Sequence, residues 1–96
     1  MERVVVIASI RPYAGHEREV VDALLKAVTF ARLEPGCQRC ELHRGRDDEQ
    51  HSLVLVERWG TTEDWRKHQG SAASQALKAD IAGIADLEVR RLQRLA

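Results

Sequence analysis

The sequence has few of the residues that mark several common kinds of protein, beginning with cysteine and the aromatics. Its 96 residues include two cysteines, two prolines, two tryptophans, one tyrosine and one phenylalanine. Two cysteines are too few for the disulfide framework of a small secreted domain, and in a reducing compartment they remain thiols. The apolar run at residues 4–10 is far shorter than the roughly 20 residues of a membrane-spanning helix, and it lacks a small-residue cleavage site. We therefore expect a cytoplasmic protein with no membrane contact.

The sequence also lacks an excess of charge of either sign. Fifteen basic residues balance fifteen acidic residues, and no cluster of lysine and arginine stands apart from neighbouring acids. A protein that binds nucleic acid or an anionic surface through electrostatics needs such a cluster. We expect a small molecule or another protein chain as the partner, and no nucleic acid. The length is that of one domain, so residues 1–96 are predicted to form a single domain.

The sequence does contain alternating signals for strands and helices. Residues 4–10 are apolar and mostly β-branched, which is typical of a strand that is buried on both faces. Residues 16–33 have the spacing of an amphipathic helix, and the sequence Glu-Pro-Gly at 34–36 ends it. The apolar stripe of this helix consists of Val20, Leu24, Ala27, Val28 and Ala31.

The second half of the sequence repeats this alternation. Residues 37–44 and 52–59 are predicted strands of a hairpin, separated by a polar segment. Thr61 begins a short helix, which Gly70 ends or bends, and helical spacing then resumes to residue 84. Residues 87–95 are predicted to form the last strand, with Leu87, Val89 and Leu95 on one face.

The resulting order, β-α-β-β-α-β, predicts an α+β protein with a ferredoxin-like fold. Its four strands form one antiparallel sheet, and both predicted helices cover the same face. The first strand would then leave an apolar patch on the uncovered face that is larger than monomers usually expose. A second copy of the same sheet would cover it, so we predict a face-to-face homodimer.

Five segments of the sequence resemble one known family. They are RPYAGHEREVVDALL, EPGCQRCELHR, LVERW, TEDWRKHQGS and the closing EVRRLQRLA. Together they resemble the antibiotic biosynthesis monooxygenases, and within that family the YgiN-like quinol monooxygenases. The resemblance covers nearly the whole chain and implies a dimeric α+β barrel with a pocket between sheet and helices. It also implies oxidation of a quinol or polyphenolic aromatic substrate by O2, with no cofactor.

Several positions differ from the pattern of that family. The resemblance implies a tyrosine at Cys40, an aromatic residue near Leu53, and a second histidine followed by phenylalanine at Ala73 and Ser74. Some oxygenases of the family also have an asparagine upstream of the strand tryptophan, where this chain has Leu53 and Leu55. These differences favour a second hypothesis: a dimeric small-molecule-binding or accessory domain of the same fold that does not catalyse a reaction.

His68 is the candidate catalytic residue. It lies one helix turn after Trp65, and histidine can accept a phenol proton near neutral pH. A phenolate gives an electron to O2 far more readily than the neutral ring, and a dry cavity protects the intermediate that follows. The alternative is that His68 only forms a hydrogen bond with the sheet edge or with a loop carbonyl.

The predicted substrate-binding residues are Trp59, Trp65, Cys40, Leu55 and Glu57. The two tryptophans would hold the aromatic ring, although Trp59 could instead belong to the core. Side chains alternate along a strand, so Leu55, Glu57 and Trp59 share one face.

A buried Glu57 would need a partner, which favours a structural ion pair across the sheet or across the dimer over a role as a base. The sequence offers four arginines on neighbouring strands for this pair: Arg39, Arg44, Arg90 and Arg91.

The two cysteines are not predicted to bind a metal. Cys37 and Cys40 are three residues apart, so in a regular strand their side chains point to opposite faces. They could share a metal only if the strand were bulged or Cys37 still belonged to the turn. A zinc site would need two further ligands, and the sequence has no second cysteine pair.

Overall fold

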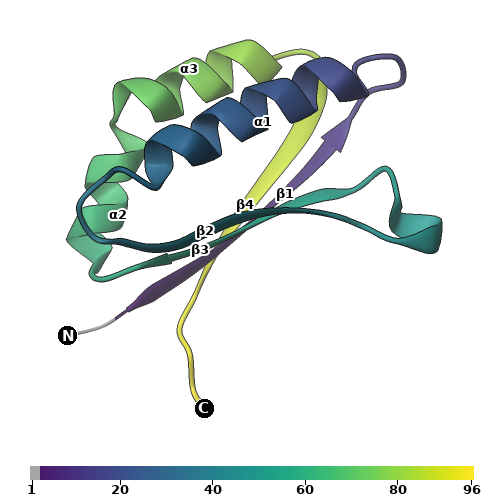
Figure 1. The fold of residues 1–96 in the computed structure, drawn as a ribbon. Helices are drawn as coiled ribbons and strands as arrows, with labels where there is room; N and C mark the ends of the chain where they lie inside the picture. The colour runs from purple at the N-terminus through teal and green to yellow at the C-terminus, as the bar shows by residue number, and fades with distance from the viewer. Residues whose placement is uncertain (1–2) are drawn as a thin grey trace.

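The computed structural model describes residues 3–96, and its four strands form one sheet with the helices on one face (Figure 1). The elements in order are β1 (Val4–Pro12), α1 (Glu17–Ala31), β2 (Cys37–Arg44), a 3₁₀ turn η1 (Asp47–Glu49), β3 (Leu53–Trp59), α2 (Thr62–Gln69), α3 (Ala72–Ile81) and β4 (Ala85–Leu92). The strand order is β2-β3-β1-β4, and all three pairings are antiparallel. The predicted α+β, ferredoxin-like architecture is confirmed.

The second helical region consists of two helices, and each begins with its own cap. The Thr61 hydroxyl accepts a hydrogen bond from the Asp64 N–H at 3.0 Å, so the predicted start of α2 is confirmed. Gly70 ends α2, and Ser71 then caps α3 by accepting a hydrogen bond from the Ser74 N–H at 3.2 Å. Such caps satisfy N–H groups that have no partner inside the helix.

The prediction for the last strand was wrong at both ends. The strand β4 covers Ala85–Leu92, so it begins and ends earlier than residues 87–95. Leu92 pairs with Val5, so only Val4 of the neighbouring strand β1 lies beyond this pair. Leu95 consequently lies outside the sheet and is 91% exposed.

The core lies between the sheet and α1. Val6, Ala8 and Ile10 of β1 point toward the helices, and the predicted helical stripe is confirmed, with Val20 and Leu24 fully buried. The intervening residues of β1 point to the other face, where Val5 and Ile7 are only partly buried. Burial of β1 on both faces is therefore not found within the single chain. None of the helices within residues 3–96 is long and apolar enough to cross a membrane.

Candidate active site

His68 lies in the last turn of α2 and faces the sheet. This helix is short, because it begins at the Thr61 cap and ends at Gly70. It lies at one end of the sheet (Figure 1). The His68 side chain is 11% exposed. A buried imidazole needs hydrogen-bond partners for its ring nitrogens, because an unsatisfied buried polar group is costly.

The first partner of His68 is Glu34, in the turn that follows α1. The distance from His68 Nδ1 to Glu34 Oε2 is 2.5 Å. The alternative for His68 assumed a hydrogen bond with the sheet edge or with a loop carbonyl. The partner is instead the carboxylate of Glu34. In the sequence Glu34 only marks the end of a helix, so its place in the site was not predicted.

Two glycines explain how this turn reaches α2. Gly36 has φ of +86°, a conformation that favours glycine, and a Cβ built on it would lie 2.3 Å from Asp64 Cγ. The Gly60 N–H also donates to the Gly36 carbonyl at 2.9 Å. The turn after α1 is therefore packed directly against the start of α2, which sets Glu34 beside His68.

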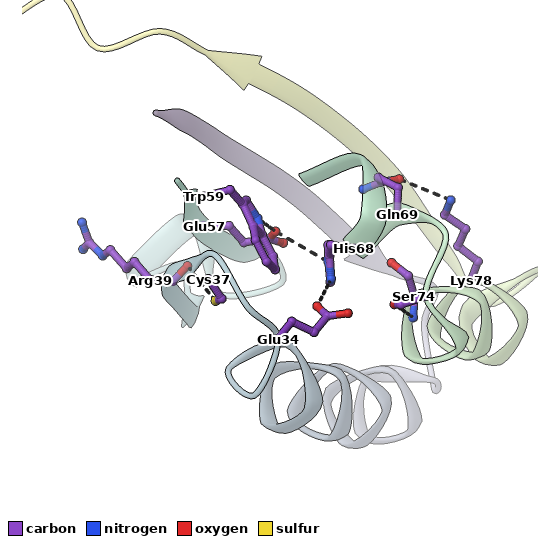
Figure 2. A network of polar contacts seen from close by, with 10 residues as sticks. Glu34, Cys37, Arg39, Glu57, Trp59, His68, Gln69, Ser74 and Lys78 are labelled. Atoms are coloured by element: carbon purple, nitrogen blue, oxygen red, sulfur yellow. Dashed lines mark hydrogen bonds and ion pairs between the residues drawn. The ribbon is translucent and has the colours of Figure 1, made fainter. Parts of the chain in front are cut away.

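The second carboxylate at the site is Glu57, which lies on β3 and is 6% exposed. Its Oε1 accepts a 2.8 Å hydrogen bond from Trp59 Nε1 and lies 3.8 Å from His68 Nε2. The Trp59 ring stacks on the imidazole, with the ring centroids 4.5 Å apart and an angle of 27° between the planes. Figure 2 shows His68 between Glu34 on one side and the Glu57–Trp59 pair on the other.

None of the four predicted arginines pairs with Glu57. Arg39 lies on the opposite face and bonds to Glu41, while Arg44 bonds to Glu17 of α1. Arg91 lies over the Trp65 ring at 4.8 Å. Arg90 alternates to the face away from the helices, where it is paired with Ile7. No ion pair between Glu57 and these arginines forms within the chain. Arg39 and Arg90 lie on the other face of the sheet, whereas Arg44 and Arg91 lie on the same face as Glu57 but contact Glu17 and Trp65 instead.

A small cavity lies beside His68, between the sheet and the helices. Its volume is about 20 Å³, which is enough for roughly one water molecule. Four of the six predicted site residues line it: His68, Cys40, Leu55 and Glu57. The other two do not. Trp59 is fully buried behind the imidazole, in a small cluster with Val4 and Val6, and Trp65 packs against that cluster.

A larger groove lies on the outer side of the helices. It has a volume of about 270 Å³ and lies between α1 and α3. Three of its residues, Ala27, Ala73 and Leu77, also line the inner cavity. The seam between the two helices is therefore all that separates the groove from the cavity, and two of its three residues are alanines.

The two thiols lie on the same face of β2, because the strand is bulged and not regular. Cys37 pairs with Trp59 and Cys40 with Glu57, and the register shifts between Cys37 and Arg39. Such a bulge adds one residue to the alternation, so residues three apart share a face. Burial is the main cause that raises the pKa of both thiols, that of Cys40 to about 12. Within residues 3–96, no three potential ligand side chains are arranged to hold a metal ion.

The fold and this site together define a small ferredoxin-like domain with a histidine and two carboxylates beneath its helices. Residues 3–80 match the sequence profile of the family described as antibiotic biosynthesis monooxygenase, and the chain belongs to this family. No match was found among curated proteins by sequence.

Solved structures of similar proteins cover almost the whole chain. Rv0793 from Mycobacterium tuberculosis is 26% identical, with a TM-score of 0.92 over 98% of this chain and 96% of that one. PA3566 from Pseudomonas aeruginosa is 25% identical, with a TM-score of 0.91 over 100% and 97% of the two chains. SnoaB from Streptomyces nogalater, a cofactor-independent oxygenase, is 17% identical with a TM-score of 0.86 over 100% and 96%. At that identity the likeness to SnoaB shows the fold alone.

Proposed function

We propose that the protein is a YgiN-like monooxygenase that oxidises a quinol or polyphenolic aromatic substrate with O2, without a cofactor. The observation that carries the proposal is the placement of His68. Its imidazole is 11% exposed, lines the cavity, and lies between the carboxylates of Glu34 and Glu57. Membership of the monooxygenase family supports the same reaction class.

His68 is proposed to start the reaction as a general base. The substrate gives its phenolic or enolic proton to His68, and the resulting anion transfers an electron to O2. Carbon–oxygen bond formation then gives a peroxide. Its O–O bond breaks, leaving one oxygen atom on the ring carbon and releasing the other as water. All four electrons that reduce O2 come from the substrate, as in the conversion of an activated methylene group to a carbonyl.

The apolar surroundings of the cavity favour this chemistry. Cys40 and Leu55 are 4% and 5% exposed, and a site without bulk water protects a radical or peroxide from side reactions. An aromatic ring is much larger than a cavity of about 20 Å³. The ring would enter from the outer groove when α1 and α3 separate at the seam, where Ala27 and Ala73 leave little side chain to displace.

Oxygen uptake tests the proposal directly. The purified protein is incubated with dihydroxynaphthalenes, menadiol-like quinols and anthrones, and the rate without protein is subtracted because these compounds autoxidise. We expect uptake above that background for at least one compound. The variant His68→Ala should lower the enzymatic rate by roughly 10²-fold or more, the usual share of a general base.

A matched control comes from a second histidine with a carboxylate partner. His16 Nδ1 lies 2.9 Å from Glu19 Oε1 at the start of α1, where both side chains are exposed and away from the open face of the sheet. The variant His16→Ala should retain the parental rate. Uptake equal to background across the whole panel would contradict the proposal, and full activity in His68→Ala would remove histidine as the base.

The second candidate is a non-catalytic dimeric small-molecule-binding or accessory domain, because the cavity beside His68 has no room for an aromatic substrate. A space for about one water molecule is far from the 300–1,000 Å³ of a typical ligand pocket. In that case the same aromatic compounds would quench tryptophan fluorescence on binding, with no oxygen uptake above background.

A further inference from the structure

We propose that Glu34 is the positioning residue for His68. In this proposal its carboxylate keeps a proton on Nδ1, so that Nε2 is the nitrogen that exchanges protons with the cavity. The catalytic part rests on the proposed function, whereas the assignment of the two nitrogens depends only on the geometry of the site.

The Nδ1 side of the ring faces an acceptor. Glu34 Oε2 lies 2.5 Å from Nδ1, and an ionised carboxylate can only accept hydrogen bonds. The bonded hydrogen must then belong to the imidazole. The hydrogen bond made by one ring nitrogen decides which nitrogen of a neutral histidine carries the proton.

The Nε2 side of the ring has no comparable partner within residues 3–96. Its nearest carboxylate oxygen, Glu57 Oε1, is 3.8 Å away, which is beyond hydrogen-bond distance. That oxygen already accepts the 2.8 Å bond from Trp59 Nε1. Since His68 lines the cavity, Nε2 remains available to a group that enters it.

The backbone around Glu34 holds its carboxylate in place. The Glu34 N–H donates to the Ala31 carbonyl at 3.1 Å, and the Glu34 carbonyl accepts from the Cys37 N–H at 3.2 Å. The packing of Gly36 against Asp64 fixes the same turn to α2. When Nε2 takes a proton, the negative charge of Glu34 also stabilises the imidazolium, because charge-assisted hydrogen bonds are stronger than neutral ones. Buried or half-buried carboxylates act on histidine bases in this way in unrelated enzymes.

Nitrogen-15 NMR of the histidine rings tests the assignment without any substrate. The parent protein, Glu34→Gln and Glu34→Ala are recorded at alkaline pH, where the imidazoles are neutral. We expect the His68 Nε2 signal of the parent at the position of an unprotonated nitrogen, with Nδ1 protonated. Glu34→Gln should retain this pattern because its amide oxygen still accepts the bond. Glu34→Ala should lose it and give a mixture of both tautomers.

A matched control removes a carboxylate from a different histidine. Glu19 contacts His16, so Glu19→Ala should change the His16 signals and leave those of His68 unchanged. Far-UV circular dichroism checks that each variant is folded. A protonated Nε2 in the neutral parent protein would overturn the proposal even if Glu34→Ala failed to fold. An unchanged His68 pattern in Glu34→Ala would overturn it as well.

Oxygen uptake tests the catalytic part separately. With a substrate that the parent oxidises, Glu34→Gln should lower kcat roughly tenfold or more, because the orientation remains but the charge that stabilises the imidazolium is lost. KM should change little, since Glu34 does not line the cavity. An unchanged kcat would overturn the charge-stabilising role. Background uptake in the parent would remove the proposed function and leave the NMR result to decide the positioning role alone.

Discussion

At the scale of single residues, burial decides which groups of the site are reactive. Cys40 is 4% exposed and lies near the Glu57 carboxylate, and these two causes raise the pKa of its thiol to about 12. The thiolate is the nucleophilic form of cysteine. Cys40 is therefore expected to behave as a small apolar side chain of the cavity wall.

Alkylation by iodoacetamide at pH 8.5 checks this expectation. In the variant Cys37→Ser, which leaves Cys40 as the single thiol, folded protein should react about a thousandfold more slowly than the same protein in denaturant. The pKa of the Cys40 thiol is raised from 9.0 to about 12 in the folded protein. The folded thiol therefore stays protonated at pH 8.5, and its rate of alkylation should increase as the pH approaches 12. Similar rates for folded and unfolded protein would contradict the prediction.

From the sequence, His68 was chosen because it lies one helix turn after Trp65, and Glu57 because it shares a strand face with Trp59. The structure brings these two side chains within 3.8 Å of each other. These local patterns did not identify Glu34, because the contact joins residues 34 positions apart and depends on how the turn after α1 packs on α2. The sequence also left open whether β2 is regular or bulged, and with it the face of Cys37. A bulge moves a side chain to the other face of a strand, and here the sequence gives no sign of it.

At the scale of elements, the turn between α1 and β2 connects the fold to the site. Gly36 is in a left-handed conformation with Asp64 close to its Cα, so the variant Gly36→Ala introduces both backbone strain and a clash. We expect a loss of about 1–3 kcal/mol in the free energy of unfolding, measured by chemical denaturation. The displaced turn should also weaken the contact between Glu34 and His68.

Gly15 provides the control for this variant. Its φ is +85°, almost equal to that of Gly36, but an added Cβ would meet no atom within 4 Å. Gly15→Ala therefore carries the backbone strain without the clash, and it should destabilise the protein less. Equal losses for the two variants would mean that the packing against Asp64 contributes nothing.

The order of the elements was predictable because each one has a strong local pattern. Apolar spacing, Glu-Pro-Gly and the Thr61 cap all act within a few residues of the chain. The extent of β4 was not predictable in this way. It depends on how many residues of β1 remain to be paired. Leu95 continues the apolar pattern of β4, but no residue of β1 pairs with it.

At the scale of the whole molecule, the helices leave one face of the sheet uncovered (Figure 1). Four partly buried apolar residues lie at the centre of this open face: Val5, Ile7, Val54 and Val56. Arg58 lies on the same face, and its Nε is buried without a hydrogen-bond partner among residues 3–96. Buried charged groups are normally paired. A second copy of the sheet would cover the apolar centre and could supply an acceptor.

We therefore propose that the protein is a face-to-face homodimer, and sedimentation at micromolar concentration should give twice the chain mass of 10.9 kDa. Ile7→Glu places a charge at the centre of the open face and should give a folded monomer, because an unpaired charge inside an apolar interface costs several kcal/mol. Leu25→Glu changes a residue of α1 that is 52% exposed on the helical side, so it should remain dimeric. A stable parent monomer would contradict the proposal. A dimer that survives Ile7→Glu would mean that the two chains associate through another surface.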